Sequence, residues 1–394
     1  MKKVSIIGMG MSADTVTQAG FQAIQNADAL IGAQRMLDAF ASLNKPCYAE
    51  YLPGSVLGVI TGSGHQNFAV LVSGDTGFYS AADGLAAILA EYDVTIIPGV
   101  SSLSYFFARI KQPWQDAKLL SCHGRDANLT DAVRRNRLTF ALTGGNANVL
   151  AAQLANAGFG NLTVHAGENL GLPSERILAL RVSELENTKI GALSVLLVEN
   201  PVFDARVRFG IPDYEFIRGD VPMTKSEVRA VTLSRLSLKP TDICCDIGAG
   251  TGSVTVEMAL AGYEGHVYAI DKDERSIELI KQNYRAFHIG NVSPICGIAP
   301  DALADLPKLN AAFIGGSGGS MNDIISALLR NNPDIRIVAN AVALESVTAA
   351  IDAFNQNGLA PEIVQISCTR AKAVGTLHMM TAQNPVFIVS GGGI

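Results

Sequence analysis

The sequence has few charged residues and an acidic excess, and this composition excludes one class of partner. Only 17% of the 394 residues are charged, and 30 Lys and Arg stand against 36 Asp and Glu, which gives a net charge of −6. Proteins that bind nucleic acid through its phosphates need a basic face. We therefore expect no nucleic-acid partner. Because 48% of the residues are hydrophobic, we expect a globular chain.

Long apolar runs and metal-ligand spacings are also missing. No uninterrupted apolar segment is long enough to span a bilayer, so a membrane is not an expected partner. The cysteines form no C-x-x-C pair or other metal spacing, so no metal site is expected. We expect most of them to be buried free thiols in a reducing cytoplasm. The six are Cys47, Cys122, Cys244, Cys245, Cys296 and Cys368.

The most informative stretch is Ile243–Ser253, where an apolar, strand-like run breaks into alternating glycines before a helical pattern begins. A strand, a glycine turn and a helix start a Rossmann-like unit, which binds its ligand at the carboxyl end of the strand. Glycine lets the backbone turn sharply and lie against a ligand. Dinucleotide-binding folds place a third glycine where this chain has Ser253. Here the third glycine is Gly252, and Asp246 begins a D-x-G-x-G-x-G pattern.

This pattern resembles motif I of the S-adenosylmethionine (SAM) methyltransferases. The next strand-like run, His266–Ile270, is followed by Asp271, a carboxylate placed to accept hydrogen bonds from ribose hydroxyls. A glycine turn without a ligand and a nicotinamide site are the alternatives. The residues that the resemblance implies for cofactor binding in this half are Thr224, Gly248, Ala249, Gly250, Thr251, Gly252, Asp271, Gly297 and Ala299.

Three strand-like runs in the first half also end in glycine-containing loops. They are Val4–Ile7, Ala69–Val72 and Ile96–Ile97. Loops of this kind at neighbouring strand ends favour one ligand cleft at the carboxyl edge of a sheet. Three ordinary strand-to-helix turns explain the pattern equally well.

The order of these loops, with Ser73–Ser80, Pro98–Ser102 and Gly167–Gly171, resembles the tetrapyrrole (corrin) methyltransferases over roughly residues 1–200. The resemblance implies two α/β subdomains, divided near Trp114–Lys118, that bind SAM between them. The residues it implies for this second SAM site are Gly8, Gly10, Gly74, Asp75, Thr76, Phe78, Ser101 and Ser102. His123 and His165 each follow a strand-like pattern and are either structural or acid–base groups.

The second half alternates strand-like and helical runs, which predicts a parallel, doubly wound sheet. Segments around Ile363–Ser367 and Pro385–Ser390 fit a closing antiparallel pair. We therefore predict an α/β protein with a two-subdomain tetrapyrrole methylase fold over residues 1–203, divided into about 1–115 and 116–203. A linker over 204–222 and a Rossmann-like SAM methyltransferase domain over 223–394 follow.

The segment Met223–Arg229 is predicted to open a helix, with Thr224 as its N-cap and Glu227 completing a capping box. With the glycine-rich run Gly315–Gly319, Asn340–Glu345 and Asn384–Phe387, it resembles the decarboxylating corrin methyltransferases. The implied reaction is SAM-dependent methylation of a precorrin, a tetrapyrrole, at C5 and C15. CO2 is lost from the ring C acetate, as a step of cobalamin biosynthesis.

A substrate with many carboxylates needs cationic partners. The implied substrate-binding residues are Lys225, Arg229, Gly316, Ser317, Gly318, Asn340 and Arg370, and Lys372, Arg109 and Arg125 are further cationic candidates. Glu345 is either a proton-transfer group or an ordinary acid at a helix N-terminus. The competing functions are a protein or RNA methyltransferase and a non-enzymatic SAM-binding sensor. We expect a cytoplasmic homo-oligomer.

Overall fold

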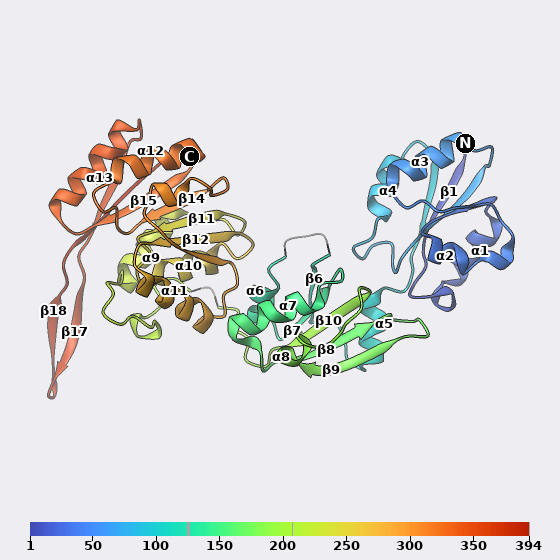
Figure 1. Cartoon of the computed structure of the whole chain (residues 1–394), viewed down its shortest axis with the longest axis horizontal. Helices are drawn as coiled ribbons and strands as arrows, with labels where there is room; N and C mark the ends of the chain where they lie inside the picture. The colour runs from blue at the N-terminus through green and yellow to red at the C-terminus, as the bar shows by residue number, and fades with distance from the viewer. Residues whose placement is uncertain (124–126, 207, 394) are drawn as a thin grey trace. The chain divides into compact units, whose positions relative to one another are not determined.

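The structure is a computed structural model that describes residues 1–123, 127–206 and 208–393 (Figure 1). Arg125 therefore lies outside the described residues. The chain divides into two compact units. The first contains Met1–Asp126, Asn136–Ala152 and Leu162–Pro201, and the second contains Ala127–Arg135, Gln153–Asn161 and Val202–Ile394.

The first unit begins with a parallel five-stranded sheet in the order β3-β2-β4-β1-β5. Its strands are β1 (Lys3–Gly8), β2 (Ala29–Ile31), β3 (Cys47–Tyr48), β4 (Asn67–Val72) and β5 (Asp93–Ile97). The helices of this part are α1 (Gln18–Asn26), α2 (Gln34–Asp38), α3 (Pro53–Gly62), α4 (Ala82–Ile88) and α5 (Ser102–Arg109). The run Phe68–Val72 is buried throughout, as a central parallel strand covered on both faces requires.

A second five-stranded sheet, in the order β6-β7-β10-β8-β9, completes this unit. Its strands are β6 (Lys118–Ser121), β7 (Leu138–Leu142), β8 (Thr163–Glu168), β9 (Arg176–Arg181) and β10 (Ser194–Glu199). The helices in this stretch of the chain are α6 (Leu129–Arg135), α7 (Ala147–Leu154) and α8 (Val182–Leu185). β6, which begins at Lys118, is the first strand of this sheet along the chain, and the subdomain division near Trp114–Lys118 stays a prediction.

The second unit contains a seven-stranded sheet in the order β13-β12-β11-β14-β15-β19-β16. Its strands are β11 (Ile243–Ile247), β12 (His266–Asp271), β13 (Val292–Cys296), β14 (Ala311–Ile314), β15 (Arg336–Ala341), β16 (Glu362–Ile366) and β19 (Val386–Gly391). β19 runs antiparallel to both β15 and β16, and the other pairings are parallel. The predicted α/β fold and the predicted closing antiparallel pair are confirmed.

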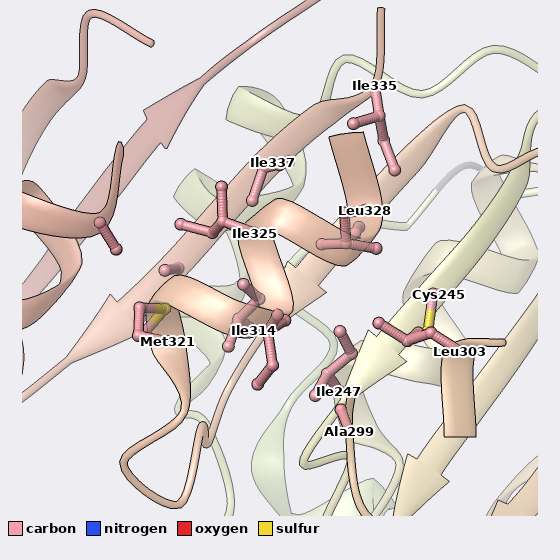
Figure 2. Close-up of a cluster of buried hydrophobic side chains, with 14 of the residues drawn as sticks. Cys245, Ile247, Ala299, Leu303, Ile314, Met321, Ile325, Leu328, Ile335 and Ile337 are labelled. Atoms are coloured by element: carbon pink, nitrogen blue, oxygen red, sulfur yellow. The ribbon is translucent and has the colours of Figure 1, made fainter. Parts of the chain in front are cut away.

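Helices cover both faces of this sheet, so side chains of one strand alternate between two cores. Cys245 and Ile247 of β11 pack with α12, whereas Cys244 packs on the opposite side with α9 and α10. Figure 2 shows the first core, in which isoleucines of β11, β14 and β15 meet the apolar face of α12. The helices are α9 (Ser226–Leu236), α10 (Ser253–Ala261), α11 (Glu274–Ala286), α12 (Met321–Asn331) and α13 (Leu344–Gln356).

The predicted linker folds as part of the second unit. Residues from Val202 onward belong to that unit, and Ile211 and Phe216 are buried in its core. The predicted N-cap is wrong, because α9 has Lys225 at its N-cap position and its side chain makes no capping hydrogen bond. Asp213 replaces the predicted Thr224 cap, since its Oδ1 accepts a hydrogen bond from Ser226 N at 3.0 Å.

A feature that the sequence analysis missed is the hairpin of β17 (Thr369–Val374) and β18 (Leu377–Ala382), which extends away from the seven-stranded sheet (Figure 1). Its side chains are mostly exposed, including apolar Leu377, Met379 and Met380. All six cysteines are free, but only Cys122, Cys244 and Cys245 are buried, so the expectation that most are buried holds for half of them. Among the described residues, no helix has the length and apolarity to cross a membrane.

Candidate active site

A cavity of about 1350 Å³ opens at the carboxyl ends of the parallel strands of the second unit. Its lining comes from the loops that follow β11, β12, β13, β14 and β15, and from residues 219–225, which we call the strap. The carboxyl edge is where doubly wound sheets bind their ligands. Ordinary small-molecule sites occupy roughly 300–1,000 Å³. The volume therefore suits a large ligand, or two ligands together.

The glycine loop after β11 has a backbone that other residues adopt only with strain. Gly248 has a φ of 71°, and Gly250 has a φ of 56°. A Cβ at Gly248 would lie 2.7 Å from Gly316 N, so this glycine lets the loops after β11 and β14 approach each other. A Cβ at Gly250 would lie 3.1 Å from Pro222 O of the strap.

Asp271 stands at the end of β12 and lines the cavity. Its Oδ2 accepts a hydrogen bond from Gly250 N at 2.8 Å, and its Oδ1 accepts one from Asp273 N at 3.0 Å. The backbone thus fixes the orientation of the carboxylate. Each carboxylate oxygen accepts more than one hydrogen bond, so capacity remains for a ligand hydroxyl.

Most of the predicted residues of the second half meet at this cavity. Those that line it are Thr224, Lys225, Gly248, Ala249, Gly250, Thr251, Asp271, Gly297, Ala299, Gly316, Ser317, Gly318 and Asn340. Two observations fit a ligand here. Thr251 Oγ1 is buried without a hydrogen-bond partner among the described residues, and a Cβ at Gly316 would meet nothing within 4 Å. The cavity therefore holds both open space at the β14 loop and an unsatisfied hydroxyl at the β11 loop.

Arg229 requires a correction, because its side chain is fully buried and does not line the cavity. Its Nε donates to Glu257 Oε1 at 2.7 Å, and its other nitrogens donate to Asp213 and to the carbonyl oxygens of Ile211 and Thr224. The guanidinium carbon also lies 4.7 Å from the centre of the Phe216 ring. Arg229 therefore holds the strap and the preceding residues in place instead of binding substrate.

Arg370, Gly252 and Glu345 also lie apart from the cavity lining. Arg370 bonds Glu227 and Asp213, and its guanidinium lowers the pKa of Glu227 to about 2. Gly252 is the N-cap of α10, where a Cβ would lie 2.9 Å from Ile280 Cγ1, so its smallness serves helix packing. Glu345 is exposed in the first turn of α13, which agrees with its interpretation as a helix N-terminal acid.

Several residues that line the cavity were not predicted from the sequence. Asp220 and Val221 come from the strap, and Lys272 and Arg275 follow β12. The charged run after Asp271 was a usable signal for the second pair. Residues 219–222 of the strap carry no periodic pattern, so nothing in their sequence indicated that they line the cavity, whereas Thr224 and Lys225 of the strap were predicted. Among the described residues, no cluster of three or more His, Cys, Asp and Glu side chains is arranged to hold a metal ion.

Asp246 lies beneath the glycine loop, fully buried in β11. Its Oδ2 accepts a hydrogen bond from Thr255 Oγ1 at 2.5 Å, and its Oδ1 has no partner among the described residues. Burial raises the pKa of Asp246 to about 7, against the opposing hydrogen bonds from Thr255 and with a smaller contribution from nearby Asp271.

This raised pKa predicts a pH-dependent stability. Between the unfolded pKa near 3.8 and the folded pKa near 7, the folded chain keeps a proton that the unfolded chain releases. Stability contributed by the neutral acid is therefore fully present below pH 4 and is lost as the pH rises to 7, by at most about 1.4 kcal/mol per pH unit. Asp246→Asn should remove this dependence. Urea unfolding at pH 5, 6, 7 and 8 gives the free energy of unfolding at each pH. If this free energy falls with pH equally in the wild type and in Asp246→Asn, Asp246 is not the group responsible.

The first unit has a smaller cavity of about 280 Å³. Of the predicted residues, Gly74, Asp75, Phe78 and Ser102 line it, with His123 as a further predicted group. Asp75 joins two loops, since its Oδ1 accepts from Gly77 N at 2.8 Å and its Oδ2 from Gly99 N at 3.1 Å. Arg35 and Tyr79 also line this cavity and were missed by the sequence analysis.

Four predicted residues of the first unit stand outside the lining: Gly8, Gly10, Thr76 and Ser101. Gly10 pairs with Gly74 through two backbone hydrogen bonds of 3.0 Å, and a Cβ at Gly8 would lie 2.6 Å from Gly99 N. These two glycines therefore serve close backbone packing beside the cavity. Ser101 caps α5 by accepting a hydrogen bond from Ser104 N.

The remaining polar candidates have local partners or exposed positions. His165 Nε2 lies 3.2 Å from Glu199 Oε1, and Arg109 Nε lies 2.7 Å from Glu175 Oε1. Lys372 is exposed on the hairpin strand β17. The contacts of His165 and Arg109 are those of structural residues, and Lys372 is a surface residue.

Two family models match the chain in order. The model described as tetrapyrrole (corrin/porphyrin) methylases matches residues 3–186, and the model described as precorrin methyltransferase domain matches residues 215–391. A relative from Sinorhizobium sp., named precorrin-6Y C(5,15)-methyltransferase [decarboxylating], is 30% identical over 404 aligned positions, which cover 97% of this chain and 94% of the relative.

Two further relatives match about half of the chain. A probable cobalt-precorrin-6B C(15)-methyltransferase (decarboxylating) from Pyrobaculum calidifontis is 45% identical over 184 residues, covering 46% of this chain and 94% of the relative. The crystal structure of precorrin-6y C5,15-methyltransferase from Geobacter metallireducens GS-15 is 35% identical. The match covers 47% of this chain and 97% of the chain in the crystal structure, with a TM-score of 0.45.

Proposed function

The chain belongs to the family of decarboxylating precorrin-6Y C(5,15)-methyltransferases, and we propose that it methylates a precorrin at C5 and C15 and removes CO2 from the ring C acetate. The observation that carries this proposal is the cavity of about 1350 Å³ in front of a glycine loop, which has room for SAM and a macrocycle together. The full-length relative from Sinorhizobium sp., whose name states both methylations and the decarboxylation, supports the same reaction.

SAM would lie along the loop after β11, with its ribose hydroxyls donating to Asp271 and its polar groups near the unpartnered Thr251 hydroxyl. When bound, SAM supplies an electrophilic methyl group. Lys225 and Lys272 also line the cavity, and they would meet carboxylates of the substrate. The loop at Gly316–Gly318 offers no side-chain bulk beyond Ser317, which suits a flat macrocycle. In the first unit, Asp75 would hold the two loops of a second SAM site in place.

The meso carbons of the reduced macrocycle are enamine-like and already nucleophilic, so the protein mainly aligns carbon, methyl and sulfur and excludes water. Such positioning supplies roughly 7–11 kcal/mol of barrier reduction. In the decarboxylation, the bond to the departing carboxylate breaks and its electron pair passes into a protonated ring imine. CO2 leaves, and the exocyclic carbon takes a proton as the resulting enamine returns its electron pair, which restores the ring imine. Neither step requires a strong base from the chain.

We assign C15 methylation and decarboxylation to the second unit and C5 methylation to the first. The name of the Pyrobaculum relative, whose match covers 46% of this chain, states the C15 methylation and the decarboxylation without a C5 methylation, and this supports the division. The test is incubation of the full chain with SAM and precorrin-6B, followed by mass spectrometry. The expected product gains two methyl groups and loses one CO2. Unchanged substrate, or methylation without loss of CO2, would refute the proposal.

Asp271→Ala should weaken ligand binding at the second unit, because the ribose would lose a charged hydrogen-bond acceptor. The expected loss is about 1.5–3 kcal/mol. Calorimetric titration of the full chain with S-adenosylhomocysteine measures it, and the wild-type chain should show two sites. Asp271→Asn keeps an acceptor without the charge and should lose less. If both variants bind as the wild type does, Asp271 does not contact the ribose.

We also propose that the enzyme works in the reducing cytoplasm as a homo-oligomer. Six free cysteines support the compartment. The exposed Leu377, Met379 and Met380 of the β17–β18 hairpin support self-association, since a second copy would cover apolar side chains that this chain leaves in solvent.

A further inference from the structure

Asn340 presents a side-chain amide to the cavity of the second unit from the carboxyl end of β15. Its Nδ2 lies 3.0 Å from Thr232 Oγ1 on α9, and its Oδ1 lies 3.3 Å from the same oxygen. Asn340 is half-buried at the cavity wall, whereas Thr232 is fully buried behind it. The hydroxyl of Thr232 therefore determines which of the two amide atoms it engages and which one stays free.

The other hydrogen bond of the Thr232 hydroxyl determines the orientation of the Asn340 amide. Its Oγ1 lies 2.8 Å from Val228 O, one turn earlier in α9. A hydroxyl has a single hydrogen to donate, and a carbonyl oxygen can only accept. Thr232 therefore donates to Val228 and has only acceptor capacity left for Asn340. The amide satisfies this when Nδ2 donates to Thr232, which agrees with the shorter of the two contacts. Asn340 Oδ1 is then left as a free acceptor.

We propose that Thr232 is a positioning residue that fixes Asn340 so that Oδ1 accepts a hydrogen bond from a ring N–H of the bound tetrapyrrole. This inference rests on the proposed function. Val228, Phe313 and Val342 also line the cavity. An acceptor among apolar groups interacts more strongly with a cationic ring N–H than it would in water.

The chemistry of an amide suits this role better than that of a carboxylate. Decarboxylation sends an electron pair into a ring imine, which accepts it only while its nitrogen is protonated. A carboxylate at position 340 would compete for that proton. The Asn340 carbonyl oxygen stabilises the N–H cation and leaves the proton on the ring. Thr232 contributes by preventing the amide from turning its NH2 group towards the same nitrogen.

The test compares Thr232→Val, which removes the hydroxyl at constant shape, with Thr232→Ser, which keeps it. Thr232→Val should lower kcat for decarboxylation and C15 methylation about tenfold, with S-adenosylhomocysteine affinity and thermal midpoint unchanged. Thr232→Ser should stay within about threefold of the wild type. Ser234→Ala, an exposed change on the same helix, is the matched control and should have no effect.

A double-mutant cycle separates positioning from general packing. Asn340→Ala should lower kcat about 10- to 100-fold, and adding Thr232→Val should lower it no further, because Thr232 acts through Asn340. The inference is overturned if Thr232→Val has wild-type kcat, if Thr232→Ser fails as badly, or if the two losses multiply. A wild-type chain that does not convert the precorrin would instead refute the proposed function.

Discussion

Gly250→Val in the full chain should abolish C15 methylation and decarboxylation while C5 methylation continues. Gly250 has a φ of 56°, where a β-branched residue is strained, and its Cβ would lie 3.1 Å from Pro222 O. The strap has to give by a few tenths of an ångström for the Cβ and by more for the two methyl groups of valine, so the cavity wall at Gly250 is displaced. A displacement of about 1 Å at a reacting centre costs roughly 10²-fold in rate. Mass spectrometry should find a product with one added methyl group and no lost CO2.

Two further variants make this result specific. Gly358→Val carries the same backbone strain at a φ of 76°, but Gly358 follows α13, does not line the cavity and has open space around its Cβ. It should give the full product. Asp75→Ala frees Gly77 N and Gly99 N in the first unit and should remove only C5 methylation. The division of labour between the units fails if Gly250→Val blocks both methylations or neither.

Arg229→Met should destabilise the second unit by about 3–5 kcal/mol, because it leaves the carboxylate of Glu257 buried without its cation. Both side chains are fully buried. Arg229 also bonds the carbonyl oxygens of Ile211 and Thr224, so its removal releases the strap at Thr224 and the preceding residues at Ile211. Urea unfolding followed by far-ultraviolet circular dichroism gives the total loss. Hydrogen exchange of α9 and α10 peptides shows where it occurs.

The matched control uses the same substitution on the same helix. Arg235 pairs with Glu362 on the surface, with 35% and 61% of their side chains exposed. Arg235→Met should therefore change stability by no more than about 1 kcal/mol. Arg229→Met with Glu257→Leu should recover part of the loss, since an apolar pair can replace a buried ion pair. If Arg229→Met and Arg235→Met lower the free energy of unfolding equally, the buried ion pair stabilises the fold no more than the exposed one does.

The glycine loop and the sheet of the second unit were predictable from the sequence because their signals are local. A buried strand, three alternating glycines and a carboxylate at the end of the next strand occupy fixed positions along the chain. The same holds for the loop at Ser73–Ser80. The strap was not predictable, because its place over Gly250 depends on contacts between distant residues. Asp213 caps α9 from thirteen positions upstream of Ser226 and displaces the local Thr224 signal.

The positive charge of two arginines also led to a wrong prediction of their role. Arg229 lies in the Met223–Arg229 segment and Arg370 was predicted as a cationic partner of the substrate, but both are bonded to carboxylates of the chain itself. The hairpin β17–β18 was missed for a different reason. None of its side chains is buried, so its sequence lacks the alternation that identifies a half-buried strand. Alternation of apolar and polar residues arises where one face of a strand is buried. A hairpin that packs against no core therefore does not show it.

The buried Arg229–Glu257 pair also determines where the chain can be cut. Glu257 accepts hydrogen bonds from Gly210 N and Ile211 N, and Arg229 bonds Asp213. All three lie before residue 215, where the precorrin methyltransferase match begins. A truncated protein starting at that boundary would lose these partners and keep two buried charges. A truncated protein that starts at Val202 retains them, so the thirteen residues 202–214 decide whether the C-terminal half can be purified by itself.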